Sequence, residues 1–136
     1  MNDTAAPANE PISLALVNAR VWTGDSRRPW ADAVAVRGDR VAAVGSSAEV
    51  RKMCVASTRV LDANGQMLIP GVHDADARFT TEGWQDRGKQ DAPRIKRGAV
   101  ADFTLVDRDL TRAGSVSIGE ARVMLTVTGG RITFER

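Results

Sequence analysis

The sequence predicts a mostly β fold, either a sandwich or a distorted barrel, with about seven to nine strands and one short α-helix. Three observations carry this prediction. Short apolar runs alternate with polar residues, Gly, Asn, Asp and Pro separate these runs, and only one segment combines helical spacing with a helix-start signal. The length of 136 residues fits one domain.

Composition narrows the class of protein. Hydrophobic residues make up 43% of the chain and charged residues 26%, with a net charge of +2, which is ordinary for a globular protein and does not indicate nucleic-acid binding. The lone cysteine, Cys54, excludes an internal disulfide and fits a reducing compartment. Residues 1–11 form a polar leader without a signal-peptide pattern, and no apolar run reaches the ~20 residues that a membrane span needs. We therefore expect a cytoplasmic protein that contacts neither membrane nor nucleic acid.

The first elements are strands joined by turns. Two short strands are expected within 12–17 and at 21–22, followed by a surface loop over 23–29, where Gly, Asp, Ser and Pro favour bends. The runs 33–36 and 41–44 flank Gly38-Asp39, a suitable two-residue turn, and predict a hairpin of core strands.

The predicted helix begins at a capping box. Ser46 and Glu49 have the spacing in which each side chain satisfies a free backbone amide of the other residue. Val50, Met53 and Cys54 then share one helical face, so two turns would cover a sheet edge and bury Cys54.

A second hairpin is expected around Asn64-Gly65, between strands at 59–62 and 66–69. Residues 72–98 show no sustained period and are interpreted as a connector.

The C-terminal part returns to strand patterns. Phe103 and Leu105 alternate with polar neighbours, as does the run 121–128, which predicts half-buried strands. Gly129-Gly130 then forms the turn of a terminal hairpin with 131–135.

The order of these segments resembles a known family. Residues 16–52 and 58–71 resemble the N-terminal β segment of metal-dependent amidohydrolases, and 98–109 with 121–136 are similar to the C-terminal β segment, especially of the YtcJ-like subgroup. The resemblance implies a composite β domain built from 12–71 and 99–136. In that family a metal-bearing barrel of ~250 residues separates the two segments, whereas here only the connector 72–98 does.

The metal motif of the family is altered. Its first barrel strand usually reads PGxxDxHxH, and the present sequence reads PGVHDADAR, which keeps Pro70, Gly71 and Asp74. The two histidine positions hold Asp76 and Arg78, and an arginine offers no lone pair to a metal. We therefore carry over no catalytic, cofactor-binding or metal-binding residue and expect no cofactor.

Four further features of the sequence each allow two interpretations. His73, Asp74 and Asp76 form either a small metal site or a polar connector that inherits an old motif. Cys54 is either a nucleophile or a core residue, and its helical spacing favours the core. The tryptophans mark either a ligand cleft or the ends of the β core, and the basic run of the connector is either a nucleic-acid contact or a solvated loop. The residues concerned are Trp22, Trp30 and Trp84 for the first pair, and Arg87, Lys89, Arg94, Lys96 and Arg97 for the second.

The sequence thus favours a non-catalytic module that works as a structural or protein-interaction domain. A homodimer, or a complex with a full-length amidohydrolase relative, is expected on the argument that the face normally packed on the barrel needs another cover. The alternatives are a residual or complemented hydrolase acting on C–N (non-peptide) bonds and a small-ligand binder in the connector pocket.

Overall fold

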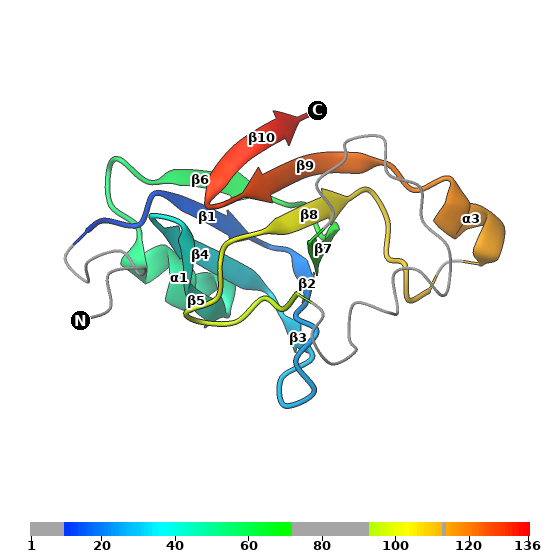
Figure 1. The fold of residues 1–136 in the computed structure, drawn as a ribbon, viewed down its shortest axis with the longest axis horizontal. Coiled ribbons are helices and arrows are strands. Elements are labelled where there is room, and N and C mark those ends of the chain that lie inside the picture. The colour runs from blue at the N-terminus through cyan, green and yellow to red at the C-terminus, as the bar shows by residue number, and fades with distance from the viewer. Residues whose placement is uncertain (1–9, 72–92, 113) are drawn as a thin grey trace.

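The computed structural model describes residues 10–71, 93–112 and 114–136, and its chain is mostly β, as predicted (Figure 1). Ten strands are present in these residues, rather than seven to nine, because the two-residue strand Trp30–Ala31, which the sequence did not predict, pairs with the strand at 20–22. The strands are β1 (Leu14–Val17), β2 (Arg20–Trp22), β3 (Trp30–Ala31), β4 (Ala33–Arg37), β5 (Arg40–Gly45), β6 (Arg59–Asp62), β7 (Met67–Pro70), β8 (Phe103–Val106), β9 (Val123–Thr128) and β10 (Arg131–Glu135). The described helices are α1 (Ser47–Met53) and α3 (Ser115–Gly119), and neither could cross a membrane.

The strands form two sheets that share one core. A four-stranded sheet has the order β5-β4-β1-β6, and a six-stranded sheet has the order β10-β9-β8-β7-β2-β3. Leu16, Val34 and Val36 of the first sheet pack with Leu68 and Phe103 of the second, all of them fully buried. Burial of such large apolar side chains contributes about 1.5–3 kcal/mol each, so this layer is the main source of stability.

The second predicted hairpin is wrong in its pairing. The turn at 63–66 has the expected positive φ angles, 53° at Asn64 and 79° at Gly65, yet β6 pairs in parallel with β1 and β7 in parallel with β2. The turn therefore carries the chain from one sheet to the other. It runs beside the β1–β2 crossing, where the carbonyl of Asn18 accepts a 2.7 Å hydrogen bond from the Gly65 amide.

Helix α1 packs through its predicted apolar face, but it covers the outer face of the four-stranded sheet rather than a sheet edge. Val50 is fully buried with Ala15, Val17, Ala33 and Ala35. Small alanines on the strands let the helix approach closely, which explains why β4 carries them.

The six-stranded sheet is built from both ends of the chain. Strand β7 pairs antiparallel with β8 over four residue pairs, from Met67↔Val106 to Pro70↔Phe103. Strand β8 is buried on both faces, including Thr104, so the prediction of a half-buried strand is wrong here. A second core explains the difference, because Met67, Ile69 and Val123 pack with Leu110, Ile118 and Ala121, near the unpredicted helix α3.

Part of the expected connector belongs to the core. Ile95 is 1% exposed, and its amide donates to the carbonyl of Thr23 at 2.8 Å. Gly98 and Ala99 then exchange backbone hydrogen bonds of 2.9 and 2.8 Å with Val41 on the edge of β5. Residues 93–98 of the expected connector are therefore ordered, since pairing with β5 gives an extended segment its order without any sequence period.

Candidate functional site

The residues that the altered family motif singled out, His73, Asp74, Asp76 and Arg78, lie outside the described residues. Trp84, Arg87 and Lys89 also lie outside them. The metal and connector interpretations of the motif therefore both stay predictions. Within the described ranges, no group of three or more His, Cys, Asp or Glu side chains is placed to hold a metal ion.

Cys54 occupies a structural position. It is the C-cap residue of α1, half-buried against the helix-covered core, and its thiol Sγ lies 3.4 Å from the carbonyl oxygen of Val50. A nucleophilic thiol needs an adjacent base, whereas the Cys54 thiol contacts a backbone carbonyl.

Trp22 and Trp30 lie opposite each other across the β2–β3 pair, and both are partly buried against the second core. The guanidinium of Arg20 lies 3.8 Å from the centre of the Trp30 ring, and its Nε is 2.6 Å from Asp109 Oδ2. This stack joins the edge of the six-stranded sheet to the segment after β8. The prediction that these tryptophans close the end of the β core agrees with this placement.

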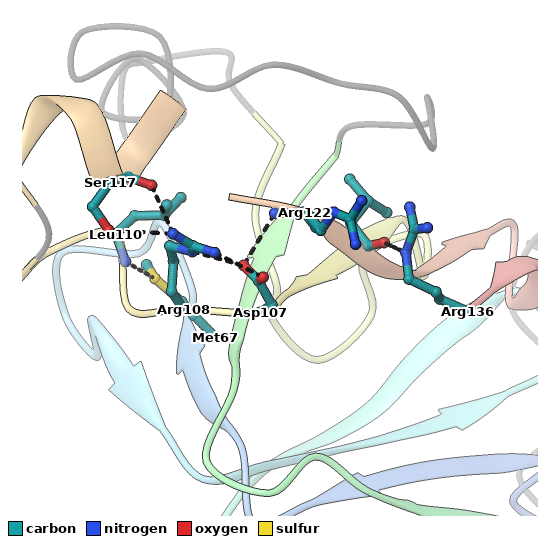
Figure 2. A network of polar contacts seen from close by, with 8 residues as sticks. Met67, Asp107, Arg108, Leu110, Ser117, Arg122 and Arg136 are labelled. Carbon is teal, nitrogen blue, oxygen red and sulfur yellow. Dashed lines mark hydrogen bonds and ion pairs between the residues drawn. The ribbon is translucent and has the colours of Figure 1, made fainter. Parts of the chain in front are cut away.

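A polar network holds the segments around α3 in place (Figure 2). Arg108 donates to both carboxylate oxygens of Asp107 at 2.9 and 3.0 Å, and a further 3.0 Å bond comes from the Arg122 amide. The side chain of Arg108 also reaches the carbonyl of Ser117 in α3 at 3.2 Å. These bonds tie the end of β8, helix α3 and the start of β9 together.

The carboxylates of these networks are held in their charged form. The Arg108 guanidinium lowers the pKa of Asp107 against the effect of burial. Burial also opposes the shift at Asp109, but hydrogen bonds from Thr111 and the nearby Arg20 leave its pKa lowered. A general acid needs a raised pKa, so these groups stabilise the fold and are unsuited to acid catalysis near neutral pH.

A groove of about 620 Å³ lies beside the edge strand β5. Its floor is formed by Ala42, Ala43 and Val44 of β5 together with Met53 and Ile95. The walls are formed by the 23–28 loop, the end of β4 and the segment 95–97, and they supply the charged residues Asp25, Arg28, Arg37, Lys96 and Arg97. We call this feature the basic groove.

Two of the basic side chains are positioned by backbone carbonyls. Arg28 Nη1 donates to Val44 O at 3.0 Å, and Arg37 Nε donates to Glu10 O at 2.7 Å. Lys96 and Arg97 belong to the basic run that the sequence indicated, whereas Arg28 and Arg37 come from segments distant in the chain. Sequence reasoning missed these two because Arg28 precedes β3 and Arg37 ends β4, and only tertiary contacts bring them beside Lys96 and Arg97. Arg94, the remaining described member of the run, donates instead to the carbonyl of Gly24 at 2.6 Å and anchors the 23–28 loop.

Comparison with known proteins connects this fold with a family. The imidazolonepropionase-like composite domain of bacteria matches residues 33–53, which cover β4, β5 and α1. N-substituted formamide deformylase of Arthrobacter pascens is 44% identical over 62 residues, which are 46% of the present chain and 11% of the deformylase. The matched segments of this chain are similar to the composite β domains of amidohydrolases.

Other relatives give the extent of the similarity. Protein LONG AFTER FAR-RED 3 of Arabidopsis thaliana is 30% identical over 79 residues, which cover 58% of this chain and 14% of that protein. A solved Bacillus thuringiensis structure shares 25% identity with a TM-score of 0.43, over 49% of this chain and 89% of its own. The composite domain thus spans 11% to 14% of the length of the two curated relatives it matches.

Proposed function

We propose that this composite domain is a non-catalytic structural or protein-interaction module. The observation that supports the proposal most directly is the pairing of β7 with β8, in which Pro70 lies opposite Phe103. In the family that the sequence resembles, the barrel enters between these two segments. Here residues 71–102 lead from one strand to its direct neighbour, a length far below the ~250 residues of a barrel.

The charge state of the described carboxylates gives a second line of support. The pKa is lowered at Glu49, Asp62, Asp107 and Asp109, and hydrogen bonds within the fold are among the causes at each of them. Side chains committed to turns, a helix cap and ion pairs are already engaged when a substrate arrives. Their role is to hold the domain in shape.

The proposal is tested by assaying the purified chain for hydrolysis of an N-substituted formamide and of simple amides, with and without added Zn²⁺ or Mn²⁺. We expect no turnover above buffer and no stoichiometric metal by elemental analysis. The Arthrobacter pascens deformylase is the matched positive control, because its N-substituted formamide substrate is given by its name. Metal-dependent turnover by the present chain would overturn the proposal in favour of a hydrolase acting on C–N bonds.

The partner is part of the same proposal. We propose a homodimer or a complex with a full-length amidohydrolase relative, in the cytoplasm, where the free Cys54 thiol is compatible with reducing conditions. The exposed large apolar side chains of the described residues are Val55, Val60 and Val100, which lie on separate segments. Sedimentation at high concentration, alone and with a barrel-containing relative, tests the association, and a strictly monomeric profile in both cases would contradict it.

A further inference from the structure

We propose that the basic groove beside β5 binds an acidic, extended peptide segment of a partner protein. The inference deepens the proposed module function, because it names the chemistry of the partner. It concerns a surface that the family comparison does not assign.

The charge of the groove selects an anionic partner. Its walls carry Arg28, Arg37, Lys96 and Arg97 against one acidic residue, Asp25. The hydrogen bonds of Arg28 and Arg37 go to neutral carbonyls, although the Glu49 carboxylate also lies within electrostatic reach of Arg28. Four cations facing two carboxylates leave an excess of positive charge that attracts acidic side chains and speeds their approach.

The shape of the groove favours an extended backbone. Strand β5 is the edge of its sheet, and its floor residues Ala42 and Ala43 have small side chains that let another chain approach closely. The carbonyl of Val44 accepts a 3.0 Å hydrogen bond from Arg28, which places a guanidinium beside this edge strand. Edge strands with exposed backbone groups are common docking sites for extended peptides.

The domain already uses the neighbouring part of this edge in the same way. Its own residues Gly98 and Ala99 pair with the backbone of Val41, and the basic groove continues from that point along β5. A peptide bound in the groove would therefore lie along β5, next to the chain's own segment at Gly98 and Ala99. Its acidic side chains would meet Lys96 and Arg97, which are exposed at the rim.

Other anionic occupants fit the groove less well. None of the described residues that line it is aromatic, so it offers no stacking platform for the bases of a single-stranded nucleic acid. A volume of about 620 Å³ also greatly exceeds that of a single phosphate ion, whose share of contacts would be small.

The test is a fluorescence-anisotropy titration of the whole chain with a short, labelled peptide of alternating glutamate and valine. We expect saturable binding that weakens as salt rises. The double variant Lys96→Glu/Arg97→Glu should weaken it by about tenfold or more, and Lys96→Gln/Arg97→Gln by less, because reversal adds repulsion to the lost attraction. Both variants change exposed side chains, and thermal unfolding checks that they remain folded.

The matched control is Arg112→Glu/Arg131→Glu, which makes the same change in net charge at exposed positions outside the groove lining. It should leave peptide affinity unchanged. An equal loss in this control, no saturable binding of the acidic peptide, displacement by millimolar inorganic phosphate, or tighter binding of a short oligo(dT) strand would each overturn the inference. These outcomes are separable from the hydrolysis assay, because a chain without turnover can still fail to bind the peptide.

Discussion

Two glycines with nearly the same backbone conformation differ in their surroundings. Gly65 has a φ of 79° and Gly130 a φ of 80°. A Cβ at Gly65 would meet nothing within 4 Å, whereas one at Gly130 would lie 2.0 Å from the carbonyl oxygen of Gly38. At Gly130 the β9–β10 turn rests directly on the β4–β5 turn, so the N-terminal and C-terminal segments meet there without space for a side chain.

This difference predicts that replacement by alanine lowers the free energy of unfolding more at Gly130 than at Gly65. Gly65→Ala should lower the free energy of unfolding by about 1–2 kcal/mol, because an L residue is strained at positive φ. Gly130→Ala should lower it by about 1–3 kcal/mol more, since its methyl group also overlaps a backbone oxygen. Urea unfolding of the two variants measures the difference, and equal losses would show that the contact between the turns is not tight.

The single residue Asp107 makes the free energy of unfolding depend on pH. Its pKa is lowered in the folded state by Arg108, so its contribution to stability is complete above the ordinary carboxyl pKa of about 4 and is lost as the pH falls through that range. Asp62 and Asp109 act in the same direction. The free energy of unfolding should therefore decline on acidification below about pH 5.

The variant Asp107→Asn isolates one part of this effect. It should destabilise the domain at pH 7 and make the decline towards pH 3 shallower, because the group whose protonation costs stability is gone. Denaturant unfolding at a series of pH values gives the slope. Asp32→Asn, at an exposed aspartate between β3 and β4, is the control, and an identical slope in wild type and Asp107→Asn would refute the role of the Asp107–Arg108 pair.

Helix α1 is an element whose start is determined by a local sequence signal, the capping box. The Ser46 hydroxyl accepts a 3.1 Å hydrogen bond from the Glu49 amide, and Glu49 Oε1 accepts one of 3.1 Å from the Ser46 amide. The capping box expected from the sequence is therefore present, and it also lowers the pKa of Glu49. The sequence predicts this pair of hydrogen bonds because Ser46 and Glu49 lie within one helical turn of each other.

Ser46→Ala should lower the free energy of unfolding by about 1 kcal/mol, since it leaves a helix amide without its cap. Ser57→Ala, at an exposed serine after the helix, should change it little. Thermal unfolding of both proteins compares them directly. A loss at Ser46 no greater than at Ser57 would mean that the packing of Val50 alone holds the helix.

The chain crosses between the two sheets at the turns that contain Asn18 and Asn64. Local sequence signals predict these turns but not how the strands that they connect are paired. Asn18 and Asn64 both have a φ near 54°, which suits turns, but the same conformation serves a hairpin and a crossing between sheets. Which of the two forms depends on the partner strand. Strand β6 finds β1 and β7 finds β2, so the pairing is decided by strands that lie more than forty residues earlier in the chain.

At the scale of the whole molecule, the N-terminal and C-terminal segments share one core, and we expect them to unfold cooperatively. Phe103 lies in the C-terminal segment and is fully buried in the core with Leu16 and Val34 from the N-terminal segment. Tryptophan fluorescence, to which Trp22 and Trp30 contribute, and far-UV circular dichroism should therefore report the same unfolding transition.

Phe103→Ala tests this unity. It should lower the free energy of unfolding by about 3–5 kcal/mol through the cavity it leaves, and it should shift both transitions together. Phe134→Ala, on the half-buried edge strand β10, should have a smaller effect. If only the circular-dichroism transition moved in Phe103→Ala, the two segments would be unfolding separately.

The sequence by itself determined the β class, the α1 cap, the hairpins at Gly38-Asp39 and Gly129-Gly130, and the relation to amidohydrolase composite domains. These depend on patterns within short stretches, which local backbone chemistry controls. Tertiary structure alone decided the sheet crossings, the burial of β8, the order of residues 93–98 and the gathering of Arg28 and Arg37 beside Lys96 and Arg97. Each of these depends on contacts between residues far apart in the chain, and the energy of such contacts is set by packing rather than by local propensity.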